Sequence, residues 1–150
     1  MLDDEAIALL KEYGAYLVPT TGLVDTIGID KLPKMLRDKA NYVFPLAKDS
    51  LAKAIKGNVK IALGTDAPFI PHGQNALEAV AMVDRGMSNI DAVRAATING
   101  ANLIGIEGIG QIKAGFFADI IAVDGNPIED IKALSNVRFV MKNGKVHRND

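Results

Sequence analysis

The stretch Val59-Lys60-Ile61-Ala62-Leu63-Gly64-Thr65-Asp66 indicates the fold class of this 150-residue chain. Its first five residues are mostly apolar, two are β-branched, and a glycine ends the run, as is typical of a short buried strand. A helical pattern over 32–56 ends at Gly57-Asn58 just before this strand, and another follows over 75–85. Pro45, inside the first pattern, is expected to break or kink that helix. This alternation of helix, glycine and strand predicts an α/β protein with parallel strands.

The N-terminal segment predicts one more helix and one more strand. Asp3 is placed to cap a helix that has apolar residues at helical spacing, and Gly14 is placed to end it. The short apolar run 15–19 favours a buried strand over a helix. Residues 20–22 are expected to form the loop that follows this strand.

Two further helices are predicted after the helix over 75–85. Ser88 and Asp91 form a capping-box pair for a helix that runs to about Thr97. Asn99 is expected to cap a shorter helix that ends near Gly105. We therefore expect mainly helical structure from about residue 75 to about residue 105.

The remainder of the chain changes to β character. Turns rich in glycine between 108 and 115 lead into the strand-like runs 118–123 and 137–142. Asn143-Gly144 is a strong hairpin signal between the second of these runs and residues 145–147. The tail is therefore predicted to be a small β unit appended to a βα region.

The composition excludes several classes of partner. Seventeen basic and eighteen acidic side chains give a net charge of -1, and no basic stripe stands out, so we expect no nucleic-acid partner. No uninterrupted apolar run is long enough to cross a bilayer, so we expect no membrane partner. The absence of cysteine excludes disulfides and thiolate nucleophiles. Residues 1–5 are acidic where a secretory signal is basic and then apolar, and as a true N-terminus they predict a cytoplasmic protein.

Asp66 is the candidate catalytic residue. In parallel α/β proteins ligands bind beyond the carboxyl ends of strands, and a carboxylate there can bind a divalent cation or accept a proton from water. Asp also often caps the next turn or helix, so the local sequence leaves both roles open.

The chain has two histidines, and neither has a clear partner. His72, on the proline-punctuated loop 67–74, is a candidate for contacting substrate at the mouth of a site, or it lies on the surface without a role. His147 is expected at the surface near the end of the last strand. Two distant histidines and one aspartate lack the familiar spacing of a metal site.

The order of motifs from residue 61 onward resembles the amidohydrolase superfamily. Ala62-Leu63-Gly64-Thr65-Asp66-Ala67 is similar to the eighth barrel strand of that superfamily. Residues 92–101, Ala-Val-Arg-Ala-Ala-Thr-Ile-Asn-Gly-Ala, resemble the helix pair that follows that strand. Residues 109–120 resemble the segment that returns into the family's small β domain, and the match continues through 124–127 and 140–144.

Within the superfamily the similarity is to imidazolonepropionase-like proteins and to dipeptidases that cut Xaa-Pro or similar peptides. Residues 2–7 resemble the segment after the sixth strand of that branch, and residues 16–20 then correspond to the seventh. The resemblance implies the C-terminal portion of a (β/α)8 barrel, about strands seven and eight with their helices, over residues 1–107. It implies part of a composite β-sandwich domain over residues 108–150.

The resemblance also implies a chemistry. Such enzymes hydrolyse amide or peptide bonds with one or two divalent metals, commonly zinc, which activate a hydroxide. The strand-eight aspartate binds metal and shuttles the proton from the attacking hydroxide to the leaving amine, and Asp66 occupies that position here. The other family ligands, a His-x-His, often a carboxylated lysine, and further histidines, have no counterpart in this sequence.

A barrel of this type needs about 250 residues, so we expect this chain to be the C-terminal part of a longer enzyme and to be inactive alone. Its strands would have unpaired edges, which predicts a homo-oligomer or a complex with the remainder of the barrel. The substrate is expected to be a small molecule or peptide. The alternative is a non-catalytic α/β assembly or binding module derived from a truncated amidohydrolase.

Overall fold

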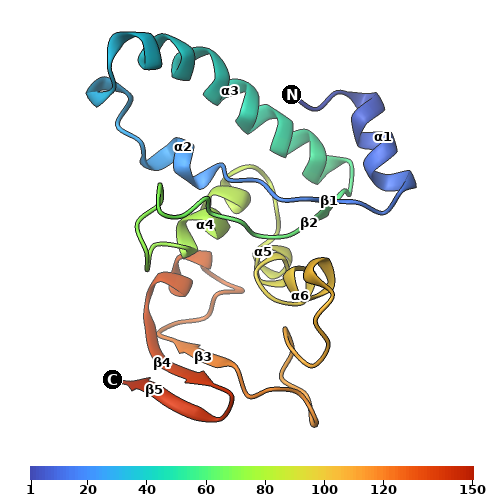
Figure 1. Cartoon of the computed structure of the whole chain (residues 1–150), viewed down its shortest axis with the longest axis vertical. Helices are drawn as coiled ribbons and strands as arrows, with labels where there is room; N and C mark the ends of the chain where they lie inside the picture. Colours follow the sequence, from blue (N-terminus) through green and yellow to red (C-terminus); the bar gives the residue numbers. More distant parts are fainter.

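The computed structural model describes the backbone of residues 1–150 and every side chain except that of Lys31. Helices and short strands alternate in the first two thirds of the chain, and a small sheet follows (Figure 1). In chain order the elements are α1 (Asp4–Glu12), β1 (Tyr16–Leu17), α2 (Gly22–Thr26), η1 (Ile29–Lys31), α3 (Lys34–Lys56), β2 (Lys60–Ile61), α4 (Ala76–Asp84), α5 (Asn89–Ala95), α6 (Ile98–Ile104), β3 (Ile120–Val123), η2 (Ile131–Ser135), β4 (Val137–Lys142) and β5 (Lys145–Asn149). The predicted α/β class is confirmed.

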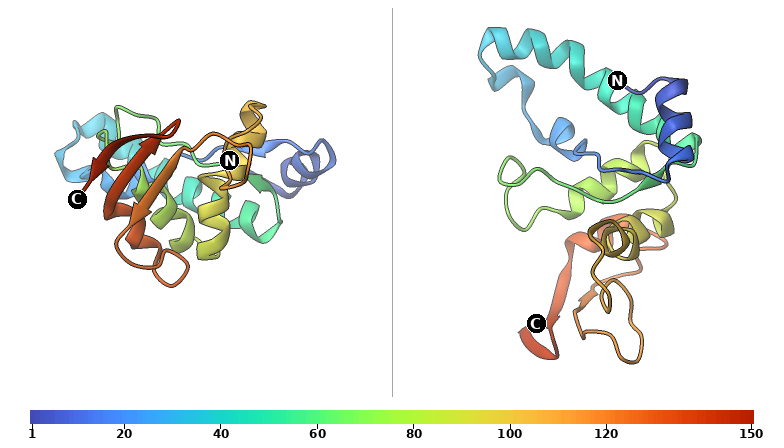
Figure 2. Two further views of the ribbon diagram at one scale, coloured as in Figure 1. Left: turned by 90° about the horizontal axis from the view of Figure 1, so that it is seen from below. Right: turned by 45° about the vertical axis from the view of Figure 1, so that its right-hand side comes forward.

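β1 and β2 pair in parallel, as the alternation of helix and strand predicts. Leu17 lies opposite Ile61 in this pair. α1 and α3 lie on one side of the strands, and α4, α5 and α6 lie on the other (Figures 1 and 2). Both strands are shorter than the predicted runs 15–19 and 59–63, because in the described part of the chain each has the other as its sole strand neighbour.

The edge of β2 that faces away from β1 is bonded by the end of α5 and the first turn of α6. The Leu63 amide donates to the Ala95 carbonyl at 3.0 Å, and the Asn99 side-chain amide donates to the Ile61 carbonyl at 2.8 Å. Asn99 lies inside α6, whose N-cap position is Thr97, so the prediction that Asn99 caps this helix is wrong. Its side chain instead gives a partner to a strand carbonyl that would otherwise lack one. The outer edge of β2 has no strand neighbour in the described part of the chain, as predicted, but these two hydrogen bonds partly satisfy it.

The outer edge of β1 is open. Among the described residues, none forms a hydrogen bond with the backbone of Val18, which is 44% exposed. A groove of about 480 Å³ runs beside this edge, and Leu17, Pro19, Phe44 and Leu51 are among the residues that line it. This edge keeps the unpaired character that the sequence predicts.

Asn99→Ala is expected to lower the free energy of unfolding by about 1–2 kcal/mol, because the Ile61 carbonyl loses its partner. Asn102→Ala is the matched control, since Asn102 is exposed in the same helix and its loss should change stability by less than about 0.5 kcal/mol. Urea unfolding of the two variants measures the difference. Equal losses would show that the Asn99 bond does not stabilise the chain.

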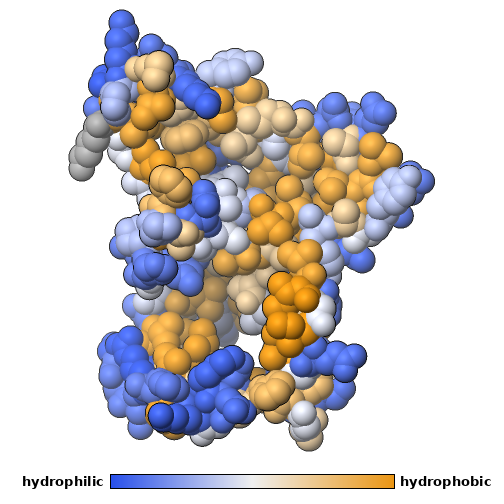
Figure 3. Space-filling model, in the orientation of Figure 1, coloured by the Kyte–Doolittle hydropathy of each residue, from blue (hydrophilic) through white to orange (hydrophobic). Residues whose placement is uncertain are grey.

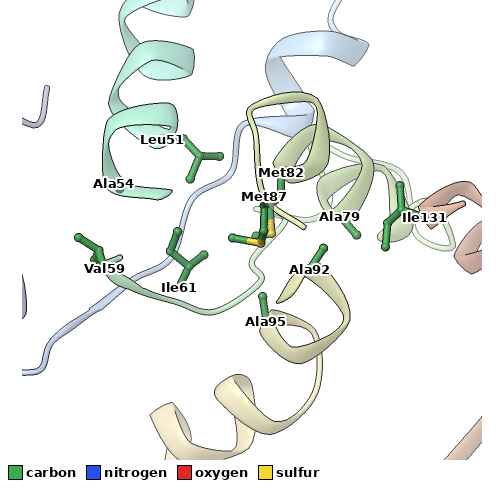
Figure 4. Close-up of a cluster of buried hydrophobic side chains, with 10 residues drawn as sticks. All are labelled: Leu51, Ala54, Val59, Ile61, Ala79, Met82, Met87, Ala92, Ala95 and Ile131. Carbon is green, nitrogen blue, oxygen red and sulfur yellow. The ribbon is translucent and has the colours of Figure 1, made fainter. Parts of the chain in front are cut away.

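The main hydrophobic core surrounds β2 (Figure 4). Residues of α3 close one side of the strand, and residues of α4 and α5 close the other. The small side chains of Ala79, Ala92 and Ala95 let these helices approach closely. The buried members of the cluster are Leu51, Ala54, Val59, Ile61, Ala79, Met82, Met87, Ala92, Ala95 and Ile131. The core therefore holds β2, and with it the loop that starts at its carboxyl end.

The N-terminal elements agree with the sequence in part. Asp3 caps α1 by accepting a hydrogen bond from the Ala6 amide at 2.8 Å, as predicted. A break or a kink is predicted at Pro45, and the break is wrong, because α3 continues through Pro45 to Lys56. A proline removes one amide donor, and the buried side chains on either side, Ala40 and Leu51 among them, hold the helix against its neighbours. The short helix α2 was not predicted.

The C-terminal sheet has the antiparallel order β3-β4-β5. Asn143 and Gly144 form the predicted turn, both with positive φ. Asp119 fastens this turn, because its carboxylate accepts from the Asn143 amide at 2.8 Å and from the Lys142 ammonium. Those contacts hold the pKa of Asp119 below its usual value. The 3-10 helix η2 was not predicted; its residue Ile131 is buried in the main core.

The surface is mixed in character. Polar residues cover the end of the β4–β5 hairpin, and apolar residues gather over the middle of the same face (Figure 3). Among the described residues, none of the helices combines the length and the hydropathy that spanning a bilayer requires.

Candidate functional site

The carboxyl ends of β1 and β2 meet at one edge of the strand pair, because the strands are parallel. These ends touch each other. A Cβ added to Gly64 would collide with the Val18 side chain and lie 3.7 Å from the Pro19 carbonyl oxygen. Glycine is therefore needed at position 64, and Asp66 emerges beside the loop that follows β1. We call this edge, with Thr20 and Asp66 on it, the rim.

Asp66 is exposed on the rim and has a positive φ of 52°. Its backbone carbonyl accepts from the Phe69 amide at 3.0 Å, which closes a turn. Its carboxylate receives no hydrogen bond from any residue that the structure describes, and α4 begins only at Ala76, after the N-cap position Asn75. Asp66 thus starts a turn through its backbone and does not cap a helix through its side chain. The carboxylate remains free to bind a cation or to accept a proton.

His72 lies on the loop between Asp66 and α4. Ile70, which is 1% exposed, anchors this loop in the protein interior, while His72 is exposed. No hydrogen bond joins His72 to Asp66 among the described residues. The two residues belong to the same loop between β2 and α4. His147 is exposed on β5, as predicted.

The described residues do not form a metal centre by themselves. No group of three or more histidine, aspartate or glutamate side chains within the described part of the chain is arranged to hold an ion. A site with a single carboxylate ligand does not fit the three or more protein ligands of a typical catalytic zinc. Asp66 can therefore be one ligand of a divalent metal only if other polypeptide supplies the rest.

A buried carboxylate, which the sequence did not single out, fastens the loop after β1. Glu78 of α4 is fully buried. One oxygen accepts from the Thr21 amide at 3.0 Å and from the Thr21 hydroxyl at 3.3 Å, and the other accepts from the Gly22 amide at 2.5 Å. Burial raises the pKa of Glu78, and the hydrogen bonds from Gly22 and Thr21 oppose this rise. We refer to Glu78, Thr21 and Gly22 as the Glu78 cluster.

A second contact from α4 reaches the same loop. The Arg85 guanidinium donates to the Thr21 carbonyl at 3.4 Å and to the Asp25 carboxylate at 2.8 Å. Lys48 of α3 also pairs with Asp25 at 2.6 Å. Burial by itself would raise the pKa of Asp25, but the hydrogen bonds from Lys48 and Arg85 hold it below its usual value. α2, which directly follows the loop after β1, is therefore held between α3 and α4.

A sequence signal for the Glu78 cluster does exist. Glu78, Ala81, Met82 and Arg85 recur at the spacing of one helix face, and the first three of them are buried. A charged residue on the apolar face of a helix requires a polar partner. The sequence does not say which residue that partner is, because Thr21 lies 57 positions away from Glu78.

A parallel strand pair with a free carboxylate at its carboxyl rim, followed by a small antiparallel sheet, defines an α/β protein with a candidate site on that rim. The chain belongs to the amidohydrolase family, which it matches over residues 2–147. Ochratoxinase from Aspergillus niger is 35% identical over 155 residues, which cover 97% of this chain and 32% of that enzyme. A 5-methylthioadenosine/S-adenosylhomocysteine deaminase from Dictyoglomus thermophilum is 30% identical over 135 residues, 83% of this chain and 28% of the deaminase.

The fold is shared with solved structures. A Xaa-Pro dipeptidase with methionine bound in its active site has 42% sequence identity and a TM-score of 0.92, over 99% of this chain and 38% of the dipeptidase. The ochratoxinase structure has a TM-score of 0.84. The chain spans about a third of the length of the curated relatives it matches. The relatives act as hydrolases of C–N bonds, and the family is generally metal-dependent.

Proposed function

We propose that this chain supplies Asp66 to the catalytic centre of an amidohydrolase that cleaves amide or peptide bonds, with dipeptides of the Xaa-Pro type as the substrate class. The observation that carries this proposal is the exposed Asp66 carboxylate, which has no partner among the described residues and lies at the carboxyl rim of parallel strands. The similarity to a Xaa-Pro dipeptidase supports the substrate class. In this role Asp66 accepts a proton from the attacking water and gives it to the leaving amine nitrogen.

The architecture proposed for the site is a barrel in which β1 and β2 are strands seven and eight. Residues 1–107 are then the C-terminal part of a (β/α)8 barrel, and residues 108–150 are part of a β-sandwich domain. Parallel pairing of the two strands with helices on both sides supports the first assignment. The antiparallel sheet β3-β4-β5 supports the second.

A divalent metal, zinc in the first instance, is the cofactor we propose for the assembled enzyme. It would polarise the scissile carbonyl group and lower the pKa of the attacking water. The described residues of this chain offer one ligand, Asp66, and do not fit a complete site. We therefore derive no step through the metal from this structure, and we assign the remaining ligands to polypeptide outside these 150 residues.

The partner that completes the site is proposed to be the remainder of the barrel or a second copy of this chain. The open backbone at Val18 and the groove of about 480 Å³ beside it are a suitable edge for a further strand. Exposed apolar residues, including Leu36, Tyr42, Ile106 and Ile121, leave further surface to be covered.

Two measurements test this function. The first is hydrolysis of a series of Xaa-Pro dipeptides together with the metal content of the same preparation. The second is the coding sequence upstream of Met1, where a His-x-His would supply missing ligands. Hydrolysis that scales with bound metal and stops with a chelator supports the proposal. Hydrolysis without bound metal contradicts the proposed chemistry, and a completed assembly without hydrolysis favours the non-catalytic binding module.

His72 provides a separate prediction for substrate binding. If its side chain contacts substrate, His72→Ala should raise KM by roughly tenfold, the loss of one hydrogen bond, with little change in kcat. His147→Ala is the control, because His147 is exposed on β5. Steady-state kinetics on one dipeptide measures both variants. An unchanged KM in His72→Ala would remove His72 from the binding site.

A further inference from the structure

The Glu78 cluster joins the two loops of the rim. The loop after β1 contributes the amides of Thr21 and Gly22. Glu78 belongs to α4, the helix that ends the loop starting at Asp66. β1 and β2 are themselves paired. A closed ring of contacts therefore runs through the strand pair, the two loops and the Glu78 carboxylate. Asp66 lies at the start of one of these loops.

The Glu78 carboxylate supplies acceptors that the loop after β1 and the start of α2 require. Burying an ionisable group is costly unless it is fully hydrogen-bonded, but an apolar side chain here would leave the buried Thr21 and Gly22 amides without an acceptor. Glu78 makes no ion pair among the described residues, and the hydrogen bonds that its carboxylate accepts all come from Thr21 and Gly22. α2 begins at Gly22 without a side-chain cap from Thr21, so Glu78 serves the free amides at its start.

The packing around Gly22 leaves little freedom for this loop to move. A Cβ added to Gly22 would lie 2.8 Å from a Glu78 carboxylate oxygen and 3.0 Å from the Glu78 Cα atom. The backbone of the loop therefore lies directly against α4. Thr21 is held at its amide and hydroxyl by Glu78 and at its carbonyl by Arg85.

We propose that Glu78 is a positioning residue, which fixes the loop after β1 against α4 and thereby sets the place of Asp66 on the rim. Glu78 touches neither substrate nor metal in this role. The proposal rests on the proposed function of Asp66. A shift of about 1 Å in a catalytic group can cost about a hundredfold in rate, so a side chain that holds the ring together contributes to catalysis from a distance.

The first test measures the cluster itself and needs no activity. Amide hydrogen exchange is followed in the full chain for wild type, Glu78→Gln and Met82→Leu. Glutamine keeps the shape of the side chain but has one acceptor oxygen, so exchange of the Thr21 or Gly22 amide should rise roughly ten- to a hundredfold. Met82→Leu is the matched control, because Met82 is equally buried in the same helix. It should leave both amides protected.

The second test measures the link to Asp66 in the assembled, active hydrolase. Glu78→Gln should lower kcat by about tenfold or more with Asp66 present. In an Asp66→Asn background, Glu78→Gln should hardly lower kcat further, because the carboxylate that Glu78 positions is absent. Glu78→Asp, which keeps the charge, should restore part of the rate of Glu78→Gln.

The outcomes separate the two proposals. Unchanged exchange of Thr21 and Gly22 in Glu78→Gln overturns the role of the cluster, whether or not the protein is active. Faster exchange of these amides, combined with fully additive effects of Glu78→Gln and Asp66→Asn on kcat, overturns the proposal that Glu78 positions Asp66. Absence of hydrolysis in the wild-type assembly counts against the proposed function, while the exchange result still decides whether Glu78 holds the loop.

Discussion

Asp66→Asn is expected to lower kcat for Xaa-Pro dipeptides by about 10²- to 10⁴-fold, the usual contribution of a general acid–base group. Asparagine has nearly the same shape as aspartate but can neither accept nor deliver a proton at the operating pH. KM should change little, because the substrate contacts of the rim remain. Steady-state kinetics of the assembled enzyme measures the two constants separately.

Asp38→Asn is the matched control for that experiment. Asp38 is exposed on α3, and no hydrogen bond to its side chain is found among the described residues. The same chemical change there should leave kcat and KM unaltered. A rate for Asp66→Asn within about twofold of wild type would rule out Asp66 as the proton carrier, since even a weak general base contributes about a hundredfold.

Gly22→Ala is expected to lower the free energy of unfolding by about 2.5–6 kcal/mol. The added methyl group meets the backbone of α4 as well as the Glu78 carboxylate. Overpacking of this kind costs about 1–3 kcal/mol. Moving the loop away also weakens a hydrogen bond to a charged group, which is worth about 1.5–3 kcal/mol. Urea unfolding monitored by circular dichroism measures the sum.

Gly100→Ala is the control for this substitution, because a Cβ there would lie 3.8 Å from its nearest neighbour, the Ala95 carbonyl oxygen. Gly100 is inside α6, where alanine should stabilise the helix by about 0.5–1 kcal/mol. Gly22→Ala should therefore lower the free energy of unfolding, whereas Gly100→Ala should raise it. A neutral or stabilising Gly22→Ala would mean that the loop after β1 does not lie against Glu78 in solution.

Local sequence signals predicted the elements that depend on neighbouring residues. Ser88 caps α5 by accepting from the Asp91 amide at 3.2 Å, as the capping-box pair predicts. Gly105 ends α6 with a positive φ of 70°. In both cases the interacting groups lie within one helical turn, so the sequence contains the whole signal.

The sequence failed where a side chain finds a distant partner. Asn99 was predicted to be a helix cap, because Asn favours that position. Its real partner, the Ile61 carbonyl, lies 38 positions away. Pro45 is predicted to break or kink α3, but the helix does not break, because the packing of the long helix prevails over the loss of one amide donor.

For Asp66 the sequence by itself determined the family resemblance and the place at the end of a strand, because these depend on the order of short local motifs. The tertiary structure decided that its carboxylate does not cap α4 and that β2 has a bonded outer edge while β1 has an open one. It also decided that Glu78 holds the loop after β1. Those features join residues that only packing brings together, since the partners of Glu78 and Asn99 lie tens of positions away along the chain.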